Sequence, residues 1–198
     1  MTEEICVRIP HSGSPEQIPI KSYLYDKRII FLEGAVTTES ALSVIRQIMA
    51  LSLTKEPIVL VITSTGGEIT AGLSIIDTMK SCGIPITTVV MCYAYSMGGV
   101  ISSAGTKRLI MKNSRMMLHQ PLISEFAGNV SEIEKLSERM QETKDKINRI
   151  LAENCKKSLK EVAKVTDKDT FFTAEEAKDF GLVDEIVTDF NDLFGKEN

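Results

Sequence analysis

The histidines are the first place to look for chemistry, because histidine is the side chain that exchanges protons near neutral pH. The chain has only two of them. His11 lies in an irregular N-terminal segment, whereas His119 ends the apolar run RMMLH, directly before Gln120-Pro121. A histidine at a strand end is more often structural than catalytic, so His119 becomes a candidate base only with a nucleophile beside it.

Ser96 is the candidate nucleophile. The segment VVMCYAYSMGGVISSAG passes from a β-branched strand into small residues, with Ser96 at the turn and Gly98-Gly99 beside it. A serine where a helix begins has its hydroxyl near backbone amides that favour negative charge. This is the arrangement of a nucleophile elbow, although the GxSxG string is absent. A serine that only caps the helix fits the same string.

A glycine pair, Gly66-Gly67, lies in TSTGGEITAG between a predicted buried strand and a helix. Two glycines there can turn their amides toward an oxyanion, and the Gly67 and Met97 amides would make a two-donor oxyanion hole. Glycine pairs are also common at such turns without any function. Neither nucleotide-binding pattern, GxxxxGK[ST] or GxGxxG, is present.

The candidate acid lies in DKDTFFTAEEAKDFGLVDEIV. Thr173 and Glu176 have the spacing of a capping box, so part of this string starts a helix. Asp169 precedes it in a turn from which it could reach an imidazole, while Asp167 and Asp184 are rivals that spacing alone does not exclude. A serine protease needs a nucleophile, a base and an acid that holds the base in one tautomer. In chain order these roles fall to Ser96, His119 and Asp169.

Alternating strands and helices must position these residues. The pattern predicts an α/β fold with a mainly parallel sheet, which places reactive groups at the carboxyl ends of its strands. Two further runs, KRLIM and SRMMLH, are joined by Lys112-Asn113 and are predicted to pair as strands. The expected strands are 28–34, 57–64 and 84–91, and the expected helices are 38–53, 68–81 and one opening near Ser96.

Residues 131–155 place apolar side chains at spacings of three, four and seven, which predicts a long amphipathic helix. Its charged face is either a solvated surface or a contact with another subunit. Residues 1–27 form an N-terminal arm in which HSGSPEQIP is expected to break any helix or strand, and residues 28–198 form one domain. The breaking residues are Gly13, Pro15 and Pro19.

Composition limits the partners. A chain of 198 residues, 43% of them hydrophobic, can bury a core without disulfides or a structural metal. Its net charge of -4, with acidic and basic residues interleaved, argues against a nucleic-acid partner. No apolar run is long enough for a signal peptide or a membrane span, so we expect a cytoplasmic protein. The four cysteines are far apart and without a CxxC pair, which predicts reduced thiols and no zinc site.

With these motifs the sequence resembles the proteolytic subunit of the caseinolytic (ClpP) serine peptidases. The matching strings are RIIFLEG, ITSTGGEITAGLSIIDTM, YSMGG, NSRMMLHQP and DKDTFFTAEEAKDFGLVDEI, in family order over about residues 28–188. The resemblance implies a crotonase-like fold of repeated ββα units and two stacked heptameric rings, with the 131–155 helix as the handle between rings. It implies peptide and unfolded protein substrates, Ser96 as nucleophile, His119 as base, Asp169 as orienting acid, and an oxyanion hole at Gly67 and Met97.

The chain departs from the family at two places. Cys92 and Tyr95 stand where the family has small residues ahead of the serine, which predicts a bulkier wall beside the site. Family members dock an AAA+ Clp ATPase through an aromatic-lined pocket, which gives an anchor a large buried area. The matching positions here are Val59, Val61 and Ser81, so we expect weak or altered coupling to a general Clp ATPase.

The leading interpretation is a serine endopeptidase that works through an acyl-enzyme, inside a self-compartmentalised homo-oligomer, as the proteolytic component of an ATP-dependent protease. It requires no metal or cofactor. Three alternatives remain. One is a ClpP-like structural or regulatory subunit, and another is a phage-type peptidase that works without a Clp ATPase. The third is a crotonase-type acyl-CoA enzyme, which shares the two-amide hole but needs no serine activated by a base.

Overall fold

The chain folds around a seven-stranded sheet in the computed structural model, which describes residues 5–9, 16–123 and 127–189. The strands run in the order β3-β4-β5-β6-β9, and β7 pairs with both β5 and β8. Every pairing in this sheet is parallel except that between β7 and β8. The predicted parallel α/β sheet is therefore confirmed. Its strands are β3 (Ile29–Val36), β4 (Ile58–Gly67), β5 (Ile86–Tyr95), β6 (Lys107–Met111), β7 (Arg115–Leu118), β8 (Thr170–Phe172) and β9 (Glu185–Val187).

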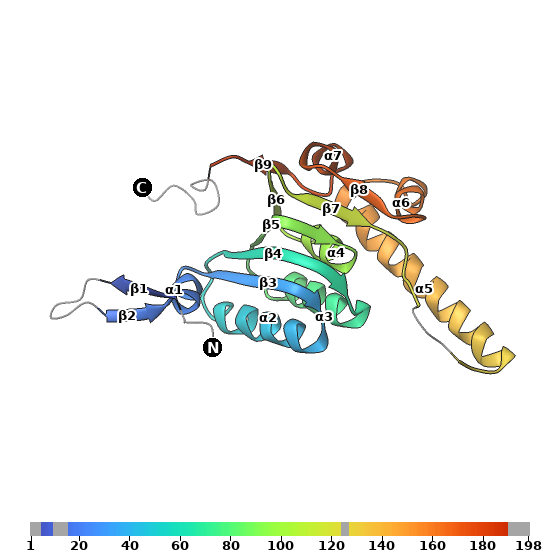
Figure 1. The fold of residues 1–198 in the computed structure, drawn as a ribbon, viewed down its shortest axis with the longest axis horizontal. Coiled ribbons are helices and arrows are strands. Elements are labelled where there is room, and N and C mark those ends of the chain that lie inside the picture. The colour runs from blue at the N-terminus through green and yellow to red at the C-terminus, as the bar shows by residue number, and fades with distance from the viewer. Residues whose placement is uncertain (1–4, 10–15, 124–126, 190–198) are drawn as a thin grey trace.

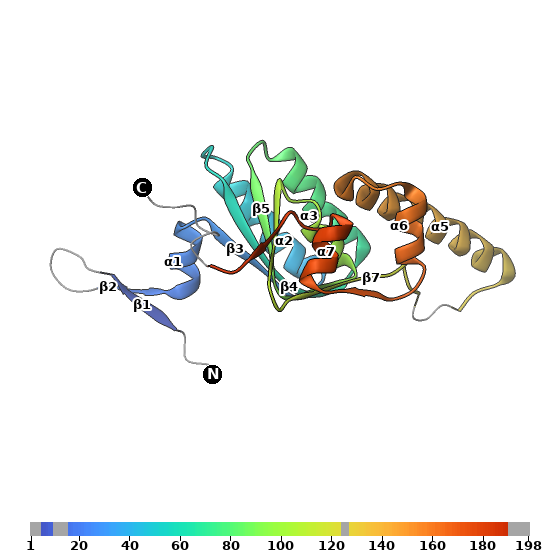
Figure 2. The same cartoon turned by 90° about the horizontal axis from the view of Figure 1, so that it is seen from above.

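Helices α2, α3 and α4 cover one face of the sheet (Figures 1 and 2). The main core lies between this face and the helices, because β-branched side chains alternate inward along β3, β4 and β5. Capping boxes fix four helix starts, including the predicted one at Thr173 and Glu176. The helices that follow β3 are α2 (Thr38–Leu51), α3 (Ile69–Ser81), α4 (Met97–Ser102), α5 (Val130–Cys155), α6 (Leu159–Thr166) and α7 (Ala174–Phe180).

The expectation that β6 and β7 pair with each other is wrong. Both strands pair with β5 instead, β6 along Thr87–Val90 and β7 along Tyr93–Tyr95. Between these two stretches Cys92 has a φ of 67°, which interrupts the regular strand. The ten residues of β5 therefore offer two successive edges on one side, and parallel pairing with this long strand replaces a hairpin at Lys112-Asn113.

The N-terminal arm is more regular than its sequence predicts. Strands β1 (Cys6–Ile9) and β2 (Glu16–Pro19) form a separate antiparallel pair, and α1 (Ile20–Asp26) joins it to β3. The expectation that HSGSPEQIP breaks any strand is therefore wrong for its last four residues, since a proline is tolerated at the end of an edge strand. The hairpin projects away from the main sheet (Figure 1), and His11, Gly13 and Pro15 lie outside the described residues.

The helix predicted at 131–155 is present as α5, whose N-terminal half extends beyond the sheet (Figures 1 and 2). Its buried side chains lie in the C-terminal half, from Ile147 to Cys155. At the other end Val130 and Ile133 are exposed, at 72% and 52%. Within the described part of the chain, no helix combines the length and apolarity needed to cross a membrane.

Candidate active site

Ser96 lies at the turn between β5 and α4, at the carboxyl end of the sheet. Its backbone has φ 52° and ψ -123°, a conformation that residues with a side chain rarely adopt. The Ser96 amide donates to the Met117 carbonyl at 2.8 Å, and the amides of Gly99 and Val100 donate to the Ser96 carbonyl. The Ser96 side chain makes no capping hydrogen bond. The strained turn therefore presents the hydroxyl without using it to hold the helix.

His119 follows β7, the strand that pairs with the end of β5. Its Nε2 lies 2.6 Å from Ser96 Oγ, and its side chain is 15% exposed. When Nε2 accepts the serine proton, the ring carries its own proton on Nδ1. The two candidates predicted from distant strings are thus in hydrogen-bond contact because their strands are neighbours.

Asp169 lies on the other side of His119, but its contact with the ring is longer than that of Ser96. Its Oδ1 lies 3.3 Å from His119 Nδ1, and its side chain is 64% exposed. The contact lacks the alignment of a hydrogen bond, so within the described residues Nδ1 is a buried polar atom without a hydrogen-bond partner. Contacts of this kind commonly tighten when substrate binds.

The two rival carboxylates have other surroundings. Asp184 is held by Arg108, whose guanidinium donates to Oδ1 at 2.5 Å and to Oδ2 at 3.1 Å. Hydrogen bonding from Arg108 lowers the pKa of Asp184, despite the opposing effect of partial burial. Asp167 supplies its backbone carbonyl to Gln120 Nε2 at 2.8 Å. Of the three aspartates, Asp169 is the one that the structure brings to His119.

Gly66 and Gly67 are the last two residues of β4, and Gly66 packs directly against the turn at Ser96. A Cβ added to Gly66, which has a φ of 85°, would lie 2.6 Å from Ser96 Cβ and 2.9 Å from the Met97 nitrogen. A Cβ added to Gly67 would lie 2.2 Å from the Val36 carbonyl oxygen. No larger residue fits either position, and the backbone at Gly66, next to the Gly67 amide, lies close to the Met97 amide.

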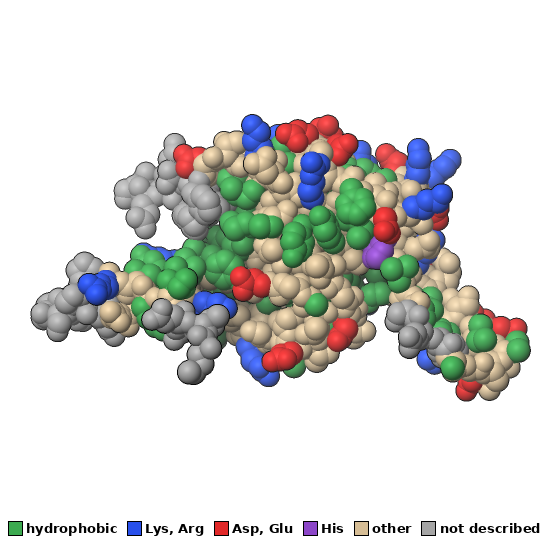
Figure 3. All heavy atoms as spheres, viewed as in Figure 1, with side chains coloured by type: hydrophobic (Ala, Val, Ile, Leu, Met, Phe, Trp, Pro, Cys, Tyr) green, Lys and Arg blue, Asp and Glu red, His purple; other side chains and the backbone are tan. Residues whose placement is uncertain are grey.

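An aromatic row borders the site on the open face of the sheet. Tyr95 stacks on Tyr93 with ring centroids 5.0 Å apart, and Phe171 meets Tyr95 edge-on at 5.8 Å. Phe171 is 60% exposed, and Figure 3 shows hydrophobic side chains gathered on this face beside the histidine. The bulk expected at Tyr95 is therefore part of a larger aromatic surface.

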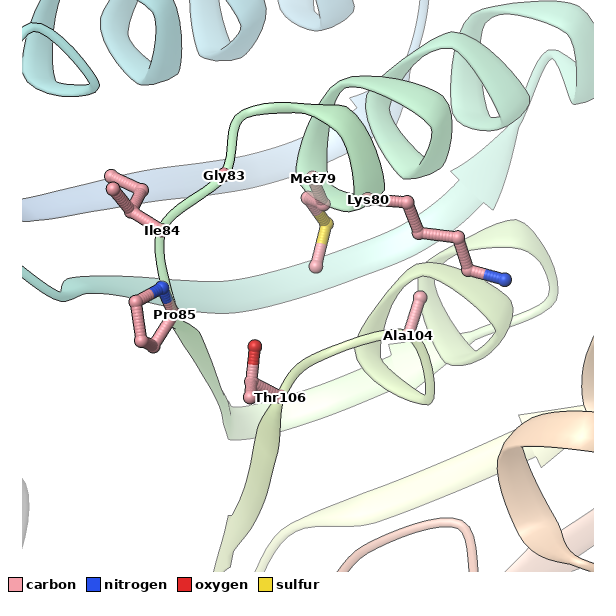
Figure 4. Close-up of a pocket in the computed structure, with 7 residues that line it drawn as sticks. All are labelled: Met79, Lys80, Gly83, Ile84, Pro85, Ala104 and Thr106. Carbon is pink, nitrogen blue, oxygen red and sulfur yellow. The ribbon is translucent and has the colours of Figure 1, made fainter. Parts of the chain in front are cut away.

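Neither a metal cluster nor the buried Cys155 supplies a second reactive centre in the described part of the chain. Within the described residues, no group of three or more His, Cys, Asp and Glu side chains could hold a metal ion. Burial raises the pKa of the Cys155 thiol to about 11, so this thiol stays protonated at neutral pH. A shallow pocket lined by Met79, Ile84, Pro85 and Thr106 lies near the start of β5 (Figure 4), at the end of the strand opposite to Ser96.

Sequence reasoning missed two residues around the site. Gln120, which donates to the Asp167 carbonyl, also accepts a hydrogen bond from Lys144 Nζ at 2.9 Å. It therefore ties the loop 167–169, which carries Asp169 and is called the acid loop below, to α5. Ser64 is fully buried near the turn at Gly66-Gly67, and its Oγ accepts a hydrogen bond from the Gly66 amide. Both residues lie in motifs that were selected for a neighbouring residue: Gln120 follows His119, and Ser64 precedes the glycine pair.

A hydroxyl held at a strained turn, in contact with a histidine, is the arrangement of a serine-type peptidase. Comparisons with known proteins agree with this class: the family model described as Clp protease matches residues 12–190. The chain belongs to the Clp protease family, and it is a serine-type peptidase.

Two relatives illustrate the similarity. ATP-dependent Clp protease proteolytic subunit 2 of Prochlorococcus marinus (strain NATL2A) is 37% identical over 191 residues, which covers 94% of this chain and 96% of the relative. ATP-dependent Clp protease proteolytic subunit of Leuconostoc citreum (strain KM20) is 37% identical over 179 residues, covering 87% and 89%. The similarity thus extends over nearly the whole length of the chain and of each relative.

Proposed function

We propose that Ser96, His119 and Asp169 form the catalytic triad of an endopeptidase that cleaves peptides and unfolded proteins. The observation that carries the proposal is the 2.6 Å contact between Ser96 Oγ and His119 Nε2 at a strained turn. The proximity of Asp169 to the second ring nitrogen supports its role as the orienting acid.

The chemistry follows from these contacts. Ser96 Oγ attacks the carbonyl carbon of the scissile bond, and His119 Nε2 takes the hydroxyl proton. The amides of Gly67 and Met97 stabilise the resulting oxyanion, and loss of one such donor costs about 100- to 1000-fold in kcat. The carbon–nitrogen bond then breaks as His119 returns the proton to the leaving amine. Water, activated by the same histidine, hydrolyses the acyl-enzyme and regenerates Ser96.

We further propose a crotonase-like domain over residues 28–198, preceded by an arm at 1–27, that assembles into two stacked heptameric rings. The projecting α5 supports the role of handle, because its far end exposes Val130 and Ile133 to solvent in the single chain. Burial of these apolar side chains against another subunit would stabilise an assembly.

A Clp ATPase is the partner that this function calls for, since the relatives are named as subunits of ATP-dependent proteases. We expect its docking to be weak or altered. Val61 is buried and Val59 packs beside Val89, Leu109 and Val187, so neither offers the exposed aromatic surface of a strong anchor. A stable complex with a general Clp ATPase that degrades a folded substrate would contradict this expectation.

Labelling with a fluorophosphonate probe, read by intact mass, tests the triad. We expect one adduct on the assembled wild-type protein and none on the Ser96→Ala or His119→Ala variants. Ser102→Ala is the matched control, because Ser102 lies in the same helix but is buried and bonds to the Gly99 carbonyl. An assembled wild-type protein without an adduct, or an adduct that persists in Ser96→Ala, would overturn the proposal.

A further inference from the structure

Ser64 occupies an unusual position for a polar side chain. It is fully buried near the end of β4, two residues before the first glycine of the turn. Its hydroxyl donates to the Gly34 carbonyl of β3 at 2.6 Å and accepts the Gly66 amide at 3.1 Å. The oxygen therefore relays a hydrogen bond from the glycine turn to the neighbouring strand.

The ladder between β3 and β4 explains why this relay exists. The register shifts here, with Gly34 opposite Ser64 and Ala35 opposite Gly66, so Thr65 is an extra residue. Such a bulge leaves a backbone amide without its regular ladder partner. The Ser64 side chain supplies an acceptor for the buried Gly66 amide at this bulge, and a buried donor that loses its acceptor costs free energy.

Ser64 also contacts the second segment of the proposed oxyanion hole. A Cβ added to Gly98 would lie 3.0 Å from Ser64 Cβ and 3.3 Å from its Oγ. Gly66 and Gly98 each adjoin one proposed donor, Gly67 and Met97. One small side chain thus lies against the backbone next to both amides.

We propose that Ser64 is a positioning residue that holds the Gly67 and Met97 amides at the separation that an oxyanion requires. This inference rests on the proposed function of these amides. Ser64 contacts no reacting atom and acts through the backbone on either side. Displacement of catalytic groups by about 1 Å can cost about 100-fold in rate, so a fixed spacing matters here.

The Ser64→Ala variant tests the inference, because it removes the acceptor and keeps the packing of the Cβ atom. We expect kcat for peptide hydrolysis to fall by at least about 10-fold, with KM changed less than about 2-fold, because the hole binds the transition state rather than the substrate. A peptide aldehyde, whose tetrahedral adduct places an oxyanion in the hole, should lose affinity by a similar factor. In Ser102→Ala, which loses a buried hydroxyl bond at the other end of α4, both quantities should stay within about 2-fold of wild type.

Ser64→Cys keeps the experiment informative if Ser64→Ala does not fold, since a thiol is a weaker acceptor of similar size and should give an intermediate kcat. A Ser64→Ala or Ser64→Cys protein with wild-type kcat and wild-type aldehyde affinity would overturn the inference. So would an equal loss in Ser102→Ala, which would indicate a general effect of stability. Wild-type protein that is not labelled at Ser96 would instead refute the proposed function, whatever Ser64 does.

Discussion

Ser96 and Asp169, which lie on opposite sides of His119, are held in place in different ways. At the nucleophile end, three backbone hydrogen bonds fix the Ser96 turn, and Gly66 packs against it so closely that no side chain fits between. At the acid end, Asp169 is 64% exposed and meets His119 at 3.3 Å without hydrogen-bond alignment. Close packing of the backbone fixes the position of Ser96. The position of Asp169 depends on its loop and on the hydrogen bond from Gln120 to that loop.

This difference indicates that Asp169 can shift with less disturbance of the fold than Ser96 can. Moving the nucleophile turn would require β4, β5 and α4 to move with it, because all three meet there. Moving Asp169 requires only the short connection between α6 and β8. If the Gly67 and Met97 amides form the proposed oxyanion hole, the alignment of His119 can vary through Asp169 while that hole stays fixed.

Asp169→Asn tests the loose end and should have the largest effect. We expect kcat to fall on the order of 1000- to 10,000-fold, because an amide no longer stabilises the imidazolium or the correct tautomer. Single-turnover acylation with a peptide ester measures this loss. The matched control is Asp167→Asn, which keeps the carbonyl that receives Gln120. Near-normal acylation in Asp169→Asn would mean that the loose contact is not part of the working site.

Gly66→Ala tests the rigid end. The new Cβ would collide with Ser96 Cβ and the Met97 nitrogen, so we expect about a 100-fold loss in kcat/KM. Gly83→Ala separates this collision from backbone strain: Gly83 has a similar φ of 73°, and no atom lies within 4 Å of an added Cβ. Both variants should unfold at a lower temperature, but only Gly66→Ala should lose activity. Equal activity in the two variants would contradict a rigid nucleophile turn.

Gln120→Ala tests the tether of the acid loop and should cost about 10-fold in kcat with little change in KM, since the loop loses one restraint. Gln120→Glu sharpens the test, because it keeps an acceptor for Lys144 but has no amide to donate to the Asp167 carbonyl. If the loop tether matters, the two variants behave alike. Gln141→Ala, which removes an exposed glutamine bonded to Asp145, is the control and should be neutral. Wild-type kcat in Gln120→Ala would show that Asp169 needs no tether.

The sequence predicted the nucleophile end better than the acid end, and the reason is physical. Local strings reveal a strand, a turn and a run of small residues, which makes Ser96 and the glycine pair candidates even though a plain helix cap fits the same string. Hydrophobic periodicity likewise predicted the helix now seen as α5 and a mainly parallel sheet that includes β3, β4 and β5. These features depend on short-range propensity and burial, which sequence patterns record directly.

Features that depend on long-range pairing were missed. Nothing in KRLIM or SRMMLH indicates that both runs lie along β5, because the pairing depends on the irregularity at Cys92. The sequence alone could not decide which of the three aspartates lies beside His119. Asp184, for example, is paired with Arg108, which is 76 residues away in the chain. Ser64 was missed because its contacts arise from a shifted register between two strands.

Asp184, which is paired with Arg108, can be compared with Asp169, the proposed orienting acid. Arg108 lowers the pKa of Asp184, so the folded state binds this proton less tightly than the unfolded state does. The stabilisation is therefore complete above the unfolded pKa of about 4, and it is lost as the pH falls through the lower folded value. Because Asp184 is 38% exposed, we expect Asp184→Asn to cost only about 1 kcal/mol at pH 7.

Urea denaturation of Asp184→Asn and wild type at pH 7 and near pH 3 measures this difference, which should shrink at the lower pH. Glu185→Gln is the control, because its contact with Lys107 at 3.1 Å joins two side chains that are each about half exposed. Such a surface pair contributes less than about 0.5 kcal/mol. Peptidase activity of Asp184→Asn should match wild type below its unfolding transition, in contrast to Asp169→Asn. A loss of activity without a loss of stability would place Asp184 in the catalytic line and reverse the assignment of the two carboxylates.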